Sequence, residues 1–269
     1  MKLNSLYLER FCPLPELPAS ALRAGFRTGA RGTHSSRTMM FDDLSAALAA
    51  TAPVAVRADY VQAITEANCL GKPTASTRRL SSQRLSELYA LDPAVPLFRV
   101  FRRLWDVDRE GHRLVALLCA IARDPLLAAT AGPVLSLSPG AEFLREPTKQ
   151  AVRQVVGERL NDAILEKVVR NAASSWTQSG HMDGRTFKKR RAVRANATSA
   201  AFALYLSNVA GFRGGDIFTS GWFAVLDCSP SAARELAIDA KRIGLIDLRM
   251  AGDVVDLNLD RLDPLLQRV

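Results

Sequence analysis

HRLVALLCAIARD, residues 112–124, is the stretch that decides the fold of this 269-residue chain. Apolar residues would occupy nearly the whole circumference of an α-helix here, so we expect a helix that is buried on all sides. Its apolar run, 114–122, is about half as long as a membrane span requires. The sequence therefore predicts a soluble protein, without a membrane partner, in which other helices surround 112–124.

The segments on either side show the amphipathic periodicity of helices. In 96–108 the residues at i, i+1, i+4, i+7 and i+8 are apolar, and they form one face of a helix. Asp124-Pro125 has the pattern of an N-cap followed by proline in the first turn. The same reasoning predicts further helices at 41–50, at 56–68, from Thr74 or Ser76 through Leu88, from Ser138-Pro139 onward, and at 151–160, 161–176 and 198–211.

The C-terminal part has a different pattern. Ser229-Pro230 predicts the start of a helix over 231–244. Residues 245–250 and 253–259 then alternate apolar and polar positions, and Gly252 suits the turn between two strands. A helix that leads into a two-stranded hairpin is the outline of a winged-helix unit. The predicted fold class is therefore mostly α, with a winged-helix-like helix plus β-hairpin at the C-terminal end.

Composition and charge divide the chain into three predicted parts. Residues 1–38 contain prolines, glycines and scattered arginines without a sustained apolar period, which is typical of a basic flexible arm. Residues 39–144 are predicted to form an N-terminal helical domain whose charges balance to zero from 41 onward. Residues 145–269 are predicted to contain a basic helical block followed by the winged-helix-like domain.

Positive charge is concentrated in one interior block. The chain carries a formal net charge of +9, and residues 145–194 hold 12 basic and 5 acidic side chains. Six cations without an acidic neighbour lie within GRTFKKRRAVRANATS (184–199): Arg185, Lys188, Lys189, Arg190, Arg191 and Arg194. Arginine and lysine bind phosphates through charge-assisted hydrogen bonds, so this cluster predicts a nucleic-acid-binding site. Ordinary solvated surface is the competing interpretation.

Two further expectations concern the geometry of the cations. If 184–199 were helical, Lys188, Arg191 and Arg194 would share one face. A second basic patch, near a capped helix start, is predicted from Lys72, Arg78 and Arg79.

The sequence offers little for catalysis or cofactor binding. His34, His112 and His181 have no Cys, Glu or second His at ligand spacing, so neither a metal nor a catalytic histidine is expected. The four cysteines form no CxxC pair, and reduced thiols in a cytoplasmic protein are the simplest interpretation. No phosphate-binding loop or nucleophile elbow is present. We therefore expect a protein that is not an enzyme and has no cofactor.

Several ordered blocks of the sequence resemble the BrxA family of bacteriophage-exclusion (BREX) defence systems. The blocks are NCLGKPTASTRRLSSQRLSELYALDP (68–93), PLFRVFRRLW (96–105), IARDPLLAATA (121–131), SSWTQSGHMDGR (174–185), LYLSNVAGFRGGDIFTSGWFAVLD (204–227) and GLIDLRMAGDVVDLNL (244–259). The resemblance covers about 40–260, and residues 1–38 depart from the family pattern. It implies a mostly helical, cytoplasmic, non-catalytic DNA-binding protein whose helical bundle is NusB-like in part. The implied partners are a methyltransferase, a phosphatase-like protein and an ATPase.

These observations lead to one leading hypothesis and two alternatives. The leading hypothesis is a DNA-binding accessory component of a phage-defence system that holds duplex DNA mainly through phosphate contacts. The first alternative is a protein–protein scaffold whose basic face meets an acidic partner. The second is an RNA-binding protein of the NusB type, which would use the same electrostatics.

Overall fold

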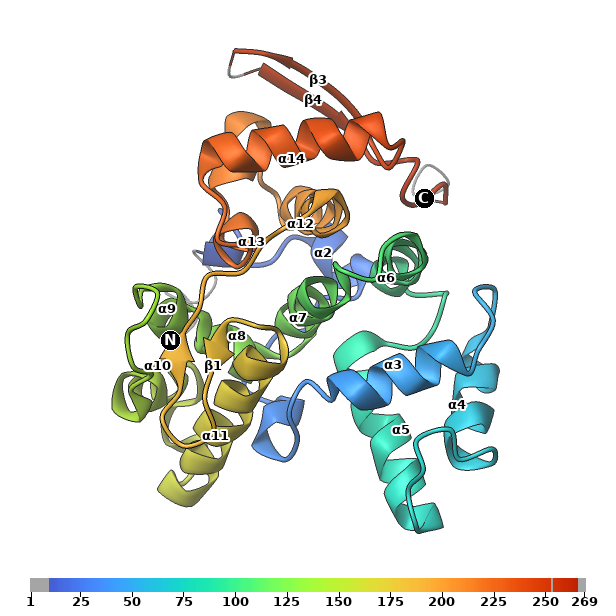
Figure 1. The fold of residues 1–269 in the computed structure, drawn as a ribbon, viewed down its shortest axis with the longest axis vertical. Coiled ribbons are helices and arrows are strands. Elements are labelled where there is room, and N and C mark those ends of the chain that lie inside the picture. The colour runs from blue at the N-terminus through green and yellow to red at the C-terminus, as the bar shows by residue number, and fades with distance from the viewer. Residues whose placement is uncertain (1–9, 253, 266–269) are drawn as a thin grey trace.

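The computed structural model describes residues 10–252 and 254–265 and is mostly helical (Figure 1). Its α-helices are α2 (Ala19–Ala24), α3 (Phe41–Ala49), α4 (Arg57–Thr65), α5 (Ala75–Tyr89), α6 (Pro96–Val107), α7 (His112–Arg123), α8 (Pro125–Ala129), α9 (Ala131–Leu135), α10 (Arg145–Val156), α11 (Asp162–Gln178), α12 (Ala197–Val209), α13 (Gly221–Ala224) and α14 (Pro230–Arg242). The 3-10 turns are η1 (Thr33–Ser35), η2 (Gly157–Arg159) and η3 (Gly214–Thr219), and the strands are β1 (Met182–Asp183), β2 (Lys189–Arg190), β3 (Asp247–Ala251) and β4 (Val254–Asn258). Within the described residues, no helix has both the length and the apolar character to cross a membrane.

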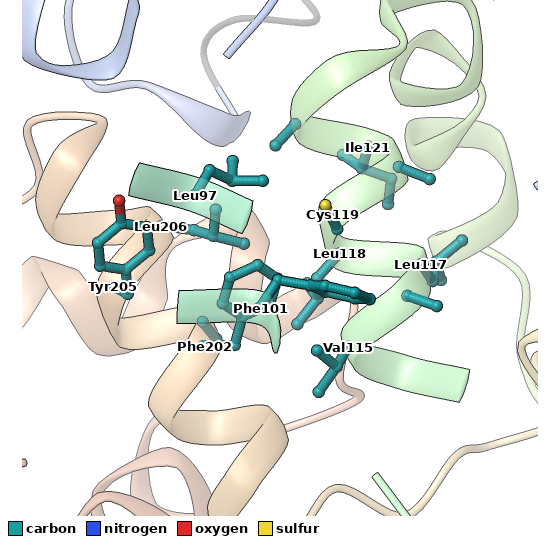
Figure 2. Close-up of a cluster of buried hydrophobic side chains, with 14 of the residues drawn as sticks. Leu97, Phe101, Val115, Leu117, Leu118, Cys119, Ile121, Phe202, Tyr205 and Leu206 are labelled. Carbon is teal, nitrogen blue, oxygen red and sulfur yellow. The ribbon is translucent and has the colours of Figure 1, made fainter. Parts of the chain in front are cut away.

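Helix α7 lies at the centre of the fold, as its sequence predicts. Every residue from Leu114 to Ala122 is buried. Helices α5, α6, α8, α11 and α12 all contact α7, and Figure 2 shows Phe101 of α6 and Phe202 of α12 directed at its side chains. Burial raises the pKa of the Cys119 thiol to about 12, so this cysteine acts as a small apolar residue. All four cysteines of the chain are free.

Residues 10–38 belong to this core and do not form the expected flexible arm, whereas residues 1–9 of that prediction lie outside the described part of the chain. Phe11 and Phe26 are buried, and both rings pack against Trp222. The Trp222 indole N–H also donates to the Phe11 carbonyl at 3.1 Å. Periodicity could not identify these two aromatic residues as part of the core, because the prolines and arginines of 10–38 interrupt any apolar pattern. One hydrophobic core contains side chains from all three parts predicted from the sequence.

Most helix boundaries agree with the predicted caps. Three predicted caps are present: Thr74 accepts a hydrogen bond from the first turn of α5, Asp124 from that of α8, and Ser229 from that of α14. The prediction of a helix from Ser138-Pro139 is wrong. Gly140 adopts φ +90° there, and the chain continues as an extended segment that pairs with β2.

The C-terminal hairpin is confirmed. Strands β3 and β4 pair antiparallel with Ala251 opposite Val254, and Gly252 adopts φ +61°. The left-handed conformation at this position is readily adopted by glycine. Leu248 is buried on the inner face of the hairpin, and Figure 1 shows both strands beyond α14 at one end of the molecule.

A buried polar network joins the N-terminal segment to α8 and α11. Asp124 Oδ2 accepts from both the backbone N–H and Nδ1 of His34, at 2.9 and 2.8 Å. His34 Nε2 lies 2.8 Å from Ser175 Oγ, and that oxygen also accepts the Met39 N–H. The order Ser–His–Asp resembles a hydrolase triad, but all three side chains are at most 1% exposed. Substrate therefore has no access to Ser175, and the network serves the fold.

The charge state of Asp124 follows from the same contacts. Burial by itself would raise the pKa of this carboxyl, but the charge of His34 and the hydrogen bonds from His34 and Leu127 outweigh it, so the pKa lies below its ordinary value. Asp124 is consequently ionised at neutral pH. Its carboxylate also accepts hydrogen bonds from two backbone N–H groups in the first turn of α8.

Gly32 is required by this network. A Cβ added at Gly32 would collide with Asp124 Oδ1, whereas one added at Gly132 would meet only the Arg10 Nε, at 3.9 Å. We expect Gly32→Ala to lower the free energy of unfolding by about 1–3 kcal/mol because the carboxylate must move. Gly132→Ala should leave it unchanged or raise it, since alanine favours a helix. Urea denaturation of both variants checks this, and equal stabilities would contradict the role given to Gly32.

Candidate nucleic-acid interface

The basic cluster lies on a small β-hairpin and the extended chain after it. In β1 and β2, Met182 pairs with Arg190 and Asp183 with Lys189. The segment 140–143 adds a second row of backbone hydrogen bonds, from Gly140 N to Arg190 O and from Phe143 N to Lys188 O. Gly184 makes the turn possible, because it has φ +100° and a Cβ there would collide with the Phe187 carbonyl.

The expectation of a shared helical face in this cluster is therefore wrong. Residues 184–196 contain no helix, and successive side chains of an extended chain point to opposite sides. Lys189 and Arg191 point outward and are exposed, while Arg190 between them points inward and is 3% exposed. Periodicity could not reveal this, because the few apolar residues of the stretch, such as Phe187 and Val193, follow no regular period.

Arg190 is a structural anchor. Its guanidinium forms an ion pair with Asp227, and the other oxygen of that carboxylate accepts the Val193 N–H at 2.8 Å. Asp227 therefore holds the hairpin and the following strand-like segment against the turn after α13. The sequence gives no sign of this pair, because 36 residues separate its two members.

His181 secures the other strand of the hairpin. Its ring is buried, with Nε2 2.7 Å from the Val225 carbonyl and Nδ1 2.8 Å from Ser179 Oγ. Burial is the main cause that lowers the pKa of His181, to about 4, and nearby Arg190 adds to it. His181 is thus a neutral structural histidine.

Two further cations are partly engaged. Lys188 is half-buried, and its Nζ donates to Thr177 Oγ1 at 2.8 Å, while burial lowers its pKa. Arg191 lies 3.3 Å from Asp183, and both side chains are about two-thirds exposed. An exposed pair of this kind contributes little and exchanges readily for another anion. Arg191 therefore remains open to a phosphate.

Arg185, Lys189 and Arg194 are exposed, and none has a hydrogen-bond or ion-pair partner for its side chain in the described part of the chain. They lie on both sides of the anchored Arg190. Their neighbour Lys188 contacts Thr177 of α11, and the face of α11 that holds Thr177 also carries Lys167, Arg170 and Ser174 at helical spacing. Sequence reasoning missed the two exposed cations of α11, although their i, i+3 spacing is visible in 167–170.

The second predicted patch is less cationic than its sequence suggests. Lys72 pairs with Asp43 at 2.8 Å, and Arg78 is half-buried; Arg79 is exposed. Figure 1 places α5, which carries both arginines, at the lower right and β1 on the left. Lys72, Arg78 and Arg79 therefore do not extend the surface around β2.

Comparison with known proteins adds no family name. No protein-family model matches the sequence, and no curated protein matches it either. Among the described residues, no group of three or more His, Cys, Asp or Glu side chains could hold a metal ion.

Because Arg190 anchors the hairpin, we expect Arg190→Ala to lower the free energy of unfolding. Arg190→Ala leaves Asp227 without its ion-pair partner. Breaking a fully buried pair costs about 3–5 kcal/mol, so we expect about 2–3 kcal/mol here because Asp227 remains 21% exposed. Lys189→Ala, the neighbouring outward cation, should leave the free energy of unfolding nearly unchanged. Equal effects of the two substitutions would contradict the inward placement of Arg190.

Because His181 is buried in its neutral form, we expect the free energy of unfolding to depend on pH. The folded state keeps this histidine neutral down to a pKa of about 4, compared with 6.5 in the unfolded chain. As the pH falls through this window, only the unfolded chain binds the proton, and the free energy of unfolding decreases. We expect a loss on the order of 2–3 kcal/mol, measured by urea denaturation at stepped pH. His181→Gln should flatten the profile between pH 6.5 and about 4, and an unchanged slope would contradict this origin.

Proposed function

We propose that the protein binds duplex DNA through its phosphates, without catalysis. The observation that supports this most is the set of exposed cations Arg185, Lys189 and Arg194, which lack partners within the described residues and flank the buried Arg190. Arg191 adds a fourth cation, since its exposed pair with Asp183 contributes little. Arginine presents a planar fork of donors that matches phosphate oxygens.

The anchoring of the segment favours binding. Strand β2 pairs with both β1 and the segment 140–143, and Arg190 and His181 connect the hairpin to the core. The exposed cations are therefore held on a defined backbone, which reduces the entropy lost when they meet a polyanion. Contacts of this kind read the sugar–phosphate backbone and not the bases, so the proposed binding is tolerant of DNA sequence.

The cellular role that we propose comes from the blocks that resemble the BrxA family. In this proposal the chain is a cytoplasmic accessory component of a BREX-type phage-defence system. It acts beside the DNA methyltransferase, the phosphatase-like protein and the large ATPase of that system. The helical bundle would be NusB-like in part, and α14 with β3 and β4 would form a winged-helix-like unit.

The surface around α14 favours protein docking as a second function of the molecule. Ile238, Ile243 and Val254 are each at least half exposed on α14, the turn after it and β4. Two nearby arginines are already paired, Arg242 with Asp239 and Arg261 with Asp247. A surface with exposed apolar groups and balanced charge suits a protein partner better than a phosphate backbone.

A charge-reversal variant tests the DNA-binding proposal. Arg185→Glu, Lys189→Glu and Arg194→Glu together should weaken binding to a fluorescent duplex at least about 100-fold, because each charge-assisted contact contributes about 1.5 kcal/mol or more. Folding should be retained, since none of the three side chains has a described partner to lose. Fluorescence anisotropy gives the affinity, and thermal unfolding confirms the fold.

The matched control carries the same change of charge elsewhere. Arg23→Glu, Arg103→Glu and Arg249→Glu alter exposed side chains of α2, α6 and β3, and they should change the affinity far less. Equal losses in the two variants, or none in the first, would refute the proposed interface. Stronger competition by structured RNA than by unlabelled duplex would favour the RNA-binding alternative instead.

A further inference from the structure

Two adjoining clefts lie away from β2, and arginines line both. The first has a volume of about 420 Å³ and is lined by residues of α4 and α5, including Arg57, Arg79 and Ser82. The second, of about 510 Å³, is lined by 30–35 with Arg84 and Arg159. Arg27 and Glu87 line both, so the clefts meet at these two residues. We refer to the pair of clefts, with Arg27, Arg31, Arg57, Arg79, Arg84 and Arg159, as the arginine cleft.

The fold assembles this site from segments that are distant in the sequence. Turn η1 contacts α5 on one side and α8 and α11 on the other, and Figure 1 shows the 30–35 segment between α5 and α11. The buried network of His34, Asp124 and Ser175 fixes that segment in place. The six arginines therefore converge because of the core, and no local charge run marks them in the sequence.

Positive charge in the arginine cleft is poorly compensated. Glu87 is the one acidic side chain among the described lining residues, and it pairs with Arg84 at 2.7 Å. Arg27 and Arg159 donate only to backbone carbonyls, those of Glu87 and Ala30. Arg31, Arg57 and Arg79 are exposed and make no side-chain hydrogen bond or ion pair with the described residues.

Glu87 is itself occupied. Its carboxylate accepts hydrogen bonds from Arg84, from Thr33 Oγ1 at 2.8 Å and from Gln83 Nε2 at 3.1 Å. Burial alone would raise the pKa of Glu87, but these three donors and the charge of Arg84 lower it overall. The carboxylate therefore stays ionised and fixes Arg84, and it has little capacity to neutralise the other arginines.

A seventh arginine lies beneath the junction of the clefts. Arg123 Nε donates to the Glu87 carbonyl at 3.1 Å, and its terminal nitrogens donate to the carbonyls of Gly25 and Ser86. Burial is the main cause that lowers the pKa of Arg123, and the neighbouring charge of Arg27 lowers it further. Arg27, which lines both clefts, and Arg123 both donate to the Glu87 carbonyl, so their positive charges add where the clefts meet and favour an anion there.

We propose that the arginine cleft binds the phosphate groups of a small polyphosphate, such as the triphosphate chain of a nucleotide. Both clefts have the size of small-molecule sites, and the concave surface suits a short anion better than the convex side of a duplex. Guanidinium groups bind phosphate oxygens in a bidentate manner. The hydroxyl group of Ser82, which lines the first cleft, offers an additional donor. This site is separate from the DNA-binding surface proposed above.

Titration calorimetry with inorganic tripolyphosphate at low salt tests the proposal on the full chain. The wild-type protein should bind it at a single site. Arg31→Ser, Arg57→Ser and Arg79→Ser together should weaken binding at least about tenfold, a change of about 1.4 kcal/mol. These three side chains have no described partner, so the variant should unfold at the wild-type temperature. ATP should bind at the same site, because it presents the same phosphate chain.

Two comparisons make the test specific. Arg103→Ser, Lys241→Ser and Arg249→Ser remove the same charge from exposed positions elsewhere and should leave the tripolyphosphate affinity unchanged. The variant with Glu at 185, 189 and 194 should also retain it, which separates this site from the proposed DNA-binding surface. The proposal is overturned if wild-type protein fails to bind tripolyphosphate, if both serine variants lose binding equally, or if only a single-stranded oligonucleotide binds the cleft.

Discussion

A helix with no solvent-facing side imposes one constraint on the rest of the chain, because its whole circumference must be covered. Helix α7 has this property from Leu114 to Ala122, and α5, α6, α8, α11 and α12 all contact it. Its C-terminal end supplies Arg123, which holds carbonyls of the N-terminal segment and α5, and Asp124, which caps α8 and binds His34. The same end of one buried helix thus organises the core and fixes the segment that completes the arginine cleft.

The two basic surfaces illustrate how burial divides charge into structural and available groups. At β2 the chain turns Arg190 inward to Asp227 and leaves its neighbours Lys189 and Arg191 outside. In the arginine cleft, Glu87 fixes Arg84 while Arg31, Arg57 and Arg79 remain exposed. In both places an ion pair fixes one arginine, and exposed cations beside it remain available to an anion. A count of cations in the sequence would assign all of them the same role.

The sequence predicted the helices well where apolar periodicity is strong, as in α6 and α7, and where a capping residue marks the start, as in α14. It failed where these signals are absent. Residues 10–38 lack a period, yet Phe11 and Phe26 bind to a tryptophan about two hundred residues away along the chain. In the basic cluster, β2 pairs not only with β1 but also with 140–143, a segment distant from it in the sequence. The arginine cleft depends on five separate segments, and such long-range convergence has no local pattern to detect.

The central claim is that exposed cations around β2 hold the phosphates of a duplex, and the most direct measurement is the salt dependence of duplex binding by the wild-type protein. About four phosphate contacts predict that the logarithm of the affinity falls with the logarithm of the salt concentration with a slope of roughly −3 to −4. A slope near zero, or no binding even at low salt, would contradict the account.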